Sequence, residues 1–269
     1  EGTSFAVASC PVPEGAYALT VEDGRGYVSG HRGGVRMVDL SQPGSLGEGA
    51  LRAGVPSDYA LYVAVGEGYA YIADGRRGIK IADVSAAWDD DTAPPPSASF
   101  FTGGSAWRIA VQGDRAYVAD GTEGLKVLDL TDPLKPVELA ALATADARDV
   151  ALSGSLLWLA DGSGGLKVYD LSGATPAQFA AVEDLDARRV RVSGSLACVA
   201  TPAGVAVLRI EDPRQPARAG SYSSAHVEAI DLSGAYLYVA EGHRGLTVLD
   251  LSAPERPQVV SRCQEIYAI

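Results

Sequence analysis

Residues 117–130 of the chain read Tyr117-Val118-Ala119-Asp120-Gly121-Thr122-Glu123-Gly124-Leu125-Lys126-Val127-Leu128-Asp129-Leu130. Alternating apolar residues on both sides of a glycine-bounded turn predict two antiparallel strands. The pattern occurs six times, and the turn glycines lie 44, 46, 41, 39 and 41 residues apart, at Gly34, Gly78, Gly124, Gly165, Gly204 and Gly245. A period near 40 residues with only strand-like segments predicts the blades of a β-propeller.

Each copy of the repeat contains enough strand pattern for one four-stranded antiparallel blade. In the third copy the strands are expected at 109–111, 116–120, 125–130 and 137–143, and two prolines within 131–136 interrupt the ladder. No window has helical periodicity, so we expect an all-β fold. The predicted blades cover about 16–55, 58–103, 105–144, 146–184, 186–224 and 226–263 of a single domain, 1–269.

The two ends of the chain leave two ways of closing the ring. Residues 3–10 resemble the fourth strand of a blade, so we expect them to join the last blade and close a six-bladed propeller. The alternative is a seven-bladed ring with a split or missing blade. Closure would bring Cys10 and Cys263 together, and a disulfide there would stabilise the fold and indicate an oxidising compartment. Cys198, between Ala197 and Val199 in a second strand, is expected to be a buried free thiol.

An aspartate ends the third strand in five of the six copies, just before a turn. We interpret these side chains as turn caps that accept hydrogen bonds from backbone N–H groups, at Asp39, Asp83, Asp129, Asp170 and Asp250. The fifth copy departs from the pattern, with Arg209 in place of the aspartate and Thr201-Pro202 in place of Asp-Gly.

The run Gly124-Leu125-Lys126-Val127-Leu128-Asp129-Leu130-Thr131-Asp132-Pro133, with its relatives at 165–172 and 245–254, resembles the LVIVD-repeat family of β-propeller proteins. The resemblance covers about residues 17–263. It implies a bacterial or archaeal exported protein, in an extracellular, cell-surface or periplasmic location. The family carries no catalytic residues that transfer to this chain, so the resemblance implies neither an enzyme nor a cofactor.

Composition narrows the classes of partner. The formal net charge is −12, which argues against nucleic acid and against an anionic membrane surface. No run approaches 18 apolar residues, so no transmembrane helix and no direct membrane insertion are expected. Together with the location that the resemblance implies, this leaves a protein or a polysaccharide at the cell surface, or a larger surface assembly, as the expected partner.

The turns between second and third strands provide the candidate binding residues. Three of the six turns are basic: Gly30-His31-Arg32-Gly33, Gly75-Arg76-Arg77-Gly78 and Gly242-His243-Arg244-Gly245. They belong to blades that become neighbours once the ring closes. The blade-to-blade connections add Trp107, Arg148, Arg188 and Glu228. Arginine with aromatic residues suits carboxylates, acidic peptides or sugars, so we predict a binding surface on this face.

Enzyme chemistry finds less support in the sequence. The alternative function is a hydrolase or lyase at the mouth of the central channel. Lactonase-like propellers use Asn in their metal sites, and this chain has no Asn and no Gly-x-Ser-x-Gly elbow. His31 and His243 lack a placed third ligand, and Asp89–Asp91 lack the spacing of a calcium loop. We therefore expect no catalytic residue, metal or cofactor.

Overall fold

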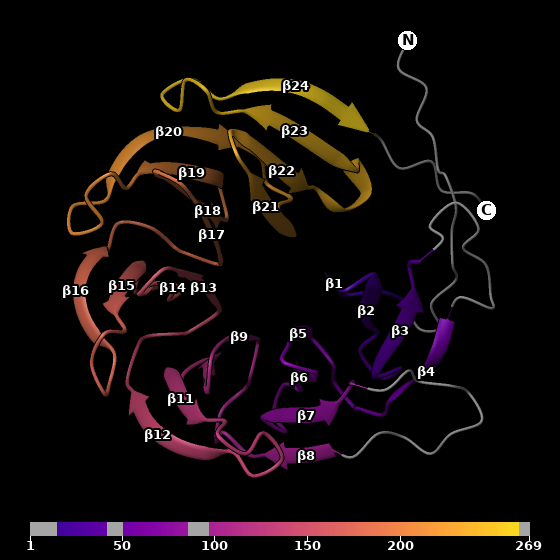
Figure 1. Cartoon of the computed structure of the whole chain (residues 1–269). Helices are drawn as coiled ribbons and strands as arrows, with labels where there is room; N and C mark the ends of the chain where they lie inside the picture. The colour runs from indigo at the N-terminus through magenta and orange to yellow at the C-terminus, as the bar shows by residue number, and fades with distance from the viewer. Residues whose placement is uncertain (1–14, 42–50, 86–96, 264–269) are drawn as a thin grey trace. The chain divides into compact units, whose positions relative to one another are not determined.

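The computed structural model describes residues 15–41, 51–85 and 97–263, and in them it contains six four-stranded antiparallel sheets (Figure 1). The strands of each sheet are paired in sequence order. The chain is therefore all-β, with the blades of a six-bladed β-propeller, as predicted. The predicted closing strand 3–10, Cys10 and the 86–96 loop lie outside the described residues, and the single-domain assignment stays a prediction.

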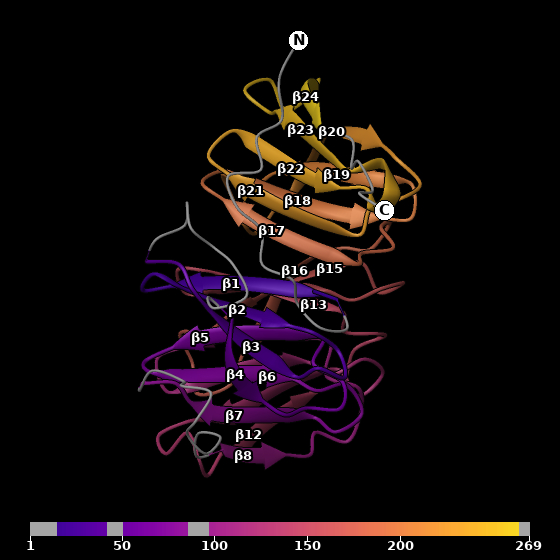
Figure 2. The same cartoon turned by 90° about the vertical axis from the view of Figure 1, so that its right-hand side faces the viewer.

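Unit 1, Glu1–Ala143, contains the first three blades. Their strands are β1 (Ala18–Glu22), β2 (Arg25–Ser29), β3 (Val35–Asp39) and β4 (Leu51–Val55); β5 (Tyr62–Gly66), β6 (Tyr69–Ala73), β7 (Ile79–Asp83) and β8 (Ser97–Phe100); and β9 (Arg108–Gln112), β10 (Arg115–Ala119), β11 (Leu125–Asp129) and β12 (Val137–Leu142). The first strands β1 and β5 lie side by side (Figure 2), and β5 also lies beside β9.

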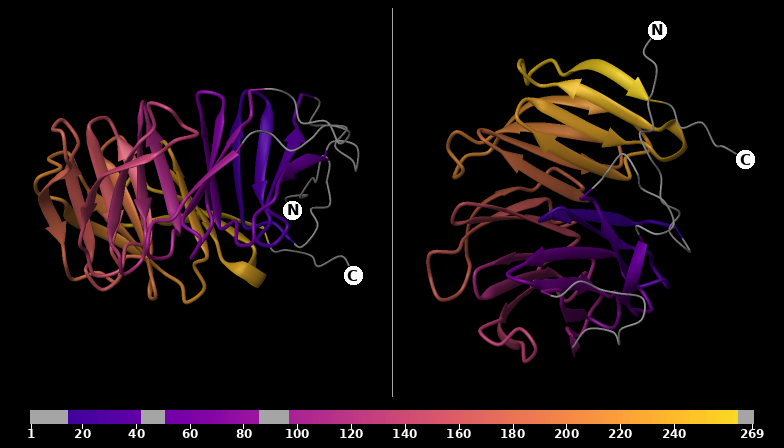
Figure 3. Two further views of the ribbon diagram at one scale, coloured as in Figure 1. Left: turned by 90° about the horizontal axis from the view of Figure 1, so that it is seen from below. Right: turned by 45° about the vertical axis from the view of Figure 1, so that its right-hand side comes forward.

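Unit 2, Thr144–Ile269, contains the other three blades (Figure 3, salmon through orange to yellow). Their strands are β13 (Asp149–Ser153), β14 (Leu156–Ala160), β15 (Leu166–Asp170) and β16 (Ala177–Val182); β17 (Arg189–Ser193), β18 (Leu196–Thr201), β19 (Gly204–Arg209) and β20 (Ala217–Ser223); and β21 (Ala229–Ser233), β22 (Tyr236–Ala240), β23 (Leu246–Asp250) and β24 (Gln258–Cys263). A short 3₁₀ turn, η3 (Gly242–Arg244), precedes β23. No helix among the described residues has the length and apolar character needed to cross a membrane.

Neighbouring blades within a unit are held together by buried apolar side chains. Tyr27 and Met37 of the first blade pack with Ile72 of the second, and Ile81 of the second packs with Val118 of the third. The small residues Ala70 and Ala73 are fully buried in these clusters, which lets the sheets approach closely. Burial of each large apolar side chain is worth roughly 1.5–3 kcal/mol.

The aspartates that end the third strands cap turns, as predicted. In each case Oδ1 accepts the backbone N–H of the Ser or Thr two residues later, at 2.7–2.9 Å, for Asp39, Asp83, Asp129, Asp170 and Asp250. Hydrogen bonds from these following residues lower the pKa of four of the carboxyl groups, those of Asp83, Asp129, Asp170 and Asp250.

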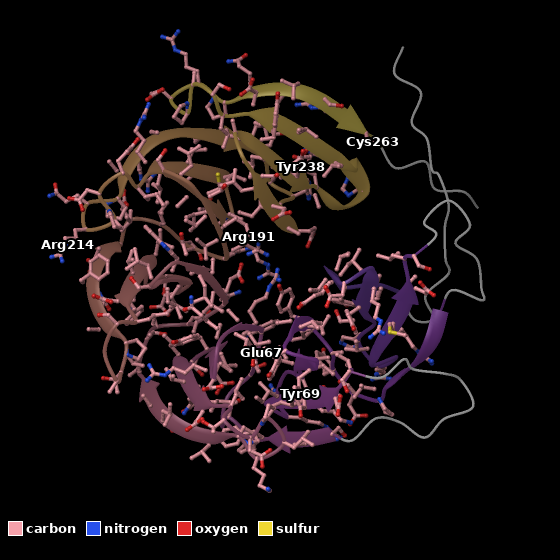
Figure 4. All side chains as sticks on the ribbon, in the orientation of Figure 1. Glu67, Tyr69, Arg191, Arg214, Tyr238 and Cys263 are labelled. Carbon is pink, nitrogen blue, oxygen red and sulfur yellow. The ribbon has the colours of Figure 1, made fainter. Side chains whose placement is uncertain are left out.

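Of the described cysteines, Cys198 tests the sequence interpretation and agrees with it. Cys198 is fully buried and free, and burial raises the pKa of its thiol to about 12. Cys263 is exposed at the end of β24 (Figure 4). Because Cys10 is outside the described residues, the disulfide between Cys10 and Cys263 stays a prediction.

Candidate functional site

The turn between the second and third strands of a blade is tied to the segment that enters the following blade. Isolated backbone bridges join His31 to Ala60, Gly75 to Ala106 and Gly162 to Ala187. These bridges hold the turns at a defined place at one end of the sheets. Side chains carried by the turns and by the entering segments are therefore positioned by backbone hydrogen bonds.

In unit 1, a buried carboxylate at the end of the second strand fixes the entering segment. Asp74 Oδ1 accepts hydrogen bonds from Ser57 Oγ at 2.5 Å and from Tyr59 N at 2.8 Å. Asp120 Oδ1 accepts one from Thr102 Oγ1 at 2.6 Å. Burial raises the pKa of Asp120, and its hydrogen bonds offset only part of that effect. Sequence analysis gave these carboxylates no role.

Unit 2 uses the same device with different partners. Asp161 accepts the N–H groups of Ala145 at 3.0 Å and Asp146 at 2.8 Å, and it forms an ion pair with Lys167 Nζ at 2.5 Å. Burial alone would raise the pKa of Asp161, but these bonds outweigh burial and lower it. The last blade has Glu241 at this position, which accepts hydroxyl hydrogen bonds from Tyr222, Ser224 and Thr247.

The first turn has a different register from the one predicted. Gly30 N donates to Gly34 O, just as Asp74 N donates to Gly78 O, so Gly30 takes the aspartate position and His31 takes the glycine position. His31 accordingly has a left-handed backbone, with φ of 52°, where Gly75 has 56°. Its ring lies 5.2 Å from that of Tyr17 and 3.8 Å from that of Tyr59. His31 makes these aromatic contacts while its backbone is left-handed, a conformation that costs free energy for a residue with a β-carbon.

Two hollows adjoin each other at the turn-bearing end of unit 1. We call the first the aromatic pocket: its volume is about 600 Å³ and its lining includes Tyr59, Arg76, Arg77, Ser105 and Trp107. The exposed fractions of Tyr59 and Trp107 are 46% and 39%, so the rings are accessible. Two guanidinium groups beside two exposed rings can hold a ligand that has both a carboxylate and a flat or apolar surface.

The second hollow, the cationic pocket, has a volume of about 780 Å³. It is lined by Arg32, Gly33, Arg36, Gly54, Pro56, Ser57, Asp58, Asp74, Arg77, Lys80 and Ser99. Asp58, Asp74 and Arg77 also line the aromatic pocket, and Arg77 forms an ion pair with Asp58. The two pockets therefore meet at this ion pair.

The structure brings five of the predicted site residues together in unit 1. Arg76, Arg77 and Trp107 line the aromatic pocket, and Arg32 lines the cationic pocket. The ring of His31 contacts Tyr59, which belongs to the aromatic pocket. Whether these residues bind a partner stays a prediction.

The other predicted residues belong to unit 2 and have local partners there. Arg148 pairs with Asp146 at 2.6 Å, and Arg188 pairs with Asp186 at 3.6 Å. The rings of His243 and His226 lie 5.1 Å apart. Arg244 and Glu228 are exposed. The carboxylates two residues before the arginines offset their charges, which the sequence interpretation did not take into account.

The lining residues that sequence analysis missed include one aromatic and two cationic side chains, those of Tyr59, Arg36 and Lys80. Tyr59 lies three residues before the first residue of β5, while Arg36 and Lys80 are the second residues of β3 and β7. The repeat alignment contains a signal for the last two, because Lys126 and Lys167 occupy the same strand position. Because side chains along a strand point alternately to its two faces, residues at this position point to the face opposite that of their buried neighbours.

Residues 15–41, 51–85 and 97–263 contain no cluster of potential metal ligands. No group of three or more His, Cys, Asp or Glu side chains there is arranged to hold an ion. The expectation that the protein has no catalytic residues, no metal and no cofactor is not tested by this finding.

The LVIVD repeat family matches residues 58–87, 103–144, 145–178, 186–224 and 225–265. No curated protein sequence matches the chain significantly. Among solved structures, the β-propeller domain of Cps50 (Swd1) from Myceliophteria thermophila has a TM-score of 0.71 at 12% identity, covering 93% of this chain and 86% of that one. A protein from Lactobacillus plantarum has a TM-score of 0.70 at 18% identity, covering 86% and 78%.

A third similar structure is PorZ of Porphyromonas gingivalis, described as an essential bacterial surface component of the type-IX secretion system. Its TM-score is 0.62 at 16% identity, and the match covers 93% of this chain but 33% of PorZ. Identities this low establish a shared fold and leave the activity of this chain open.

Proposed function

The chain belongs to the LVIVD-repeat family, and we propose that it is a non-enzymatic interaction module that binds a protein or a polysaccharide through the turn-bearing end of its blades. We place the module outside the cytoplasm, as an exported or cell-surface protein, where it works alone or within a larger surface assembly. The fold shared with a surface component of a secretion system supports this location.

One observation carries the proposal: the chain has a net charge of −12, yet arginine and aromatic side chains gather at two adjoining pockets of unit 1. Arg76 and Arg77 are exposed, and Trp107 lies beside them in the aromatic pocket. Tryptophan, tyrosine and arginine are the residue types that contribute most to binding at protein interfaces.

The chemistry of the aromatic pocket indicates the kind of ligand. A guanidinium binds a carboxylate through two parallel hydrogen bonds, and an aromatic ring offers a flat face to an apolar group or to another ring. An acidic protein segment or an acidic polysaccharide presents both features. The acidic remainder of the protein would repel such a ligand elsewhere and direct it to this end.

The experiment compares binding of the wild-type protein with that of the triple variant Arg76→Ser, Arg77→Ser, Arg244→Ser. Biolayer interferometry would be run against polygalacturonate, chondroitin sulfate and a poly-glutamate peptide. We expect at least one ligand to bind, and the triple variant to weaken that binding by about tenfold or more.

A matched control removes two arginines that lie away from the pockets, Arg214→Ser and Arg256→Ser. Arg214 lies at the outer edge of its blade, in the turn between β19 and β20 (Figure 4). Arg256 is exposed in the turn between β23 and β24. This control should bind like the wild type. Equal loss in both variants, unchanged binding in the triple variant, or no binding by the wild type would refute the proposal.

A further inference from the structure

The second residue of the third strand has the same identity in three successive blades but not the same partner. In the fourth blade Lys167 Nζ forms an ion pair with the buried carboxylate of Asp161 at 2.5 Å. In the second blade Lys80 Nζ instead donates to the backbone carbonyl of Pro56, also at 2.5 Å. Lys80 therefore stays at the wall of the cationic pocket and does not neutralise Asp74.

Asp74 has hydrogen-bond partners other than the lysine. Its Oδ1 atom already accepts the hydroxyl of Ser57 and the N–H of Tyr59. A buried carboxylate can be satisfied by such donors alone, so the lysine of the same blade is not required for it. Lys80 is thus available to a ligand in the pocket.

Arg36 reaches the same pocket from the neighbouring blade. Its side chain lies across the backbone of β4 at Gly54, where an added β-carbon would come within 2.9 Å of Arg36 Cδ. Arg32 and Arg77 complete a set of four cationic side chains around the pocket. Only Arg77 has a carboxylate partner among the described residues, namely Asp58.

The charges of the pocket do not balance. Among the described residues, its lining contains four cations and the two carboxylates Asp58 and Asp74, which gives these side chains a formal charge of +2. The described part of the lining has no aromatic side chain, and Ser99 adds an exposed hydroxyl. A volume of about 780 Å³ lies within the range of small-molecule sites.

We propose that the cationic pocket binds a phosphoryl group with two negative charges, as inorganic phosphate or as a phosphate monoester. A phosphate monoester carries a charge of about −1.5 to −2 at neutral pH and has three strong acceptor oxygens. Arginine meets such oxygens with two parallel N–H donors, and lysine meets them as a compact charge.

This site shares the cationic pocket with the proposed interaction surface and goes beyond it, because it assigns a ligand to Arg36 and Lys80, which the serine variants of that surface do not change. Lys80 would keep its hydrogen bond to Pro56 and turn its remaining donors to the ligand, since an ammonium has three donor hydrogens. Asp74 stays bonded to Ser57 and Tyr59 beneath the ligand and holds the floor of the pocket in place.

Isothermal titration calorimetry at low ionic strength tests the proposal with three probes: inorganic phosphate, methyl phosphate and N-acetylaspartate. The last has the same double charge at pH 7.5 but bears it on two carboxylates. We expect one of the phosphate probes to bind about tenfold or more tightly than N-acetylaspartate. Tighter binding of methyl phosphate identifies a monoester as the ligand, and tighter binding of inorganic phosphate identifies free phosphate.

The variants Arg36→Met and Lys80→Met should each weaken phosphate binding by about tenfold, because each removes a charge-assisted contact. Lys80→Arg should retain most of the affinity. The control is Lys135→Met, which removes an exposed lysine that pairs with Asp132 in an outer turn. This control should leave binding unchanged, and circular dichroism would check that every variant is folded.

A pH series adds a second readout for methyl phosphate. Its second pKa is about 6, so its affinity should fall by about tenfold between pH 7.5 and 5.0 as the second charge is lost. Any change in the pocket itself, which is lined by Arg32, Arg36, Asp58, Asp74, Arg77 and Lys80, would alter N-acetylaspartate binding as well. Comparison with N-acetylaspartate therefore separates a change in the pocket from a change in the charge of methyl phosphate.

Equal affinity for N-acetylaspartate, or phosphate binding that survives both methionine variants, would overturn the proposal. Neither result would affect the interaction surface, because Arg36→Met and Lys80→Met leave Tyr59, Arg76 and Trp107 of the aromatic pocket in place. Conversely, phosphate binding that depends on Lys80 would stand even if no polysaccharide or peptide bound.

Discussion

Replacing Gly78 by alanine tests how the turn glycines determine the structure of a blade. Gly78 has φ of +82°, and an added β-carbon would lie 2.2 Å from Phe100 O and 2.7 Å from Thr102 N. The left-handed backbone costs alanine about 1–2 kcal/mol. Relief of the contact must push β8 away from β7, which weakens at least one ladder hydrogen bond, worth about 1 kcal/mol. We expect the free energy of unfolding to fall by about 3 kcal/mol.

Gly113→Ala is the matched control, because it separates backbone strain from crowding. Gly113 has φ of +52°, but nothing lies within 4 Å of the position of an added β-carbon. In this variant only the left-handed backbone lowers the free energy of unfolding, and the less flexible unfolded chain raises it by about 0.4–1 kcal/mol. Its free energy of unfolding should fall by about 1 kcal/mol.

Thermal unfolding followed by circular dichroism measures both variants. For a chain of this size each kcal/mol shifts Tm by about 2–4 °C, so Gly78→Ala should lower Tm by about 6–12 °C and Gly113→Ala by about 2–4 °C. Equal shifts for the two variants would refute the reasoning, because the carbonyl of Phe100 would then have no influence beyond that of the backbone conformation.

Four further predictions concern buried or paired groups. Asp161→Ala leaves Lys167, whose side chain is 17% exposed, without its partner and should cost about 3–5 kcal/mol in urea unfolding, and adding Lys167→Met should recover much of that loss. The side-chain and backbone hydrogen bonds of Thr131 lower the pKa of Asp129 below its unfolded value. The ionised carboxylate therefore stabilises the folded protein above about pH 4, and this stabilisation is lost as pH falls through the folded pKa. Asp129→Asn should flatten the decrease in urea midpoint between pH 5 and 2. Cys198 should resist iodoacetamide in the native protein and react in urea, as mass spectrometry would detect. Peptide mapping with and without reductant should find Cys10 bonded to Cys263, and two alkylated thiols without reductant would contradict that pairing.

The fold was predictable because the copies of the repeat share the same alternation of apolar residues and the same turn glycines. Val118 and Val127 alternate with residues of the other face, and Gly121 and Gly124 lie at the turn, so pattern and turn chemistry agree. The aspartates of the third strand were also predictable, since an Asx turn involves only residues two positions apart. Local rules of this kind can be recognised without knowledge of packing.

The site was predictable only in part. Exposed turn residues such as Arg76 and Arg77 were found because the turn is short and their side chains have no core to enter. Arg36 and Lys80 lie inside strands, and their role depends on contacts with Gly54 and Pro56, which are distant in the sequence. His31 was assigned to the wrong turn position because the sequence Gly30-His31-Arg32-Gly33-Gly34 fits the repeat in two registers that differ by one residue.

Lys80 and Lys167 show why such residues cannot be assigned from the repeat alone. Both follow a glycine and an apolar residue at the start of a third strand, so their local sequences predict the same role. The two lysines differ in the partner they find: Lys80 donates to the carbonyl of Pro56, and Asp74 is satisfied by Ser57 and Tyr59, whereas Asp161 accepts two backbone N–H groups and also pairs with Lys167. Pro56, Ser57 and Tyr59 lie in the segment that enters the blade, far from Lys80 in sequence. The prediction that follows is that Ser57→Ala should draw Lys80 toward Asp74 and weaken phosphate binding in the calorimetric assay, whereas unchanged binding would show that Lys80 is placed by Pro56 alone.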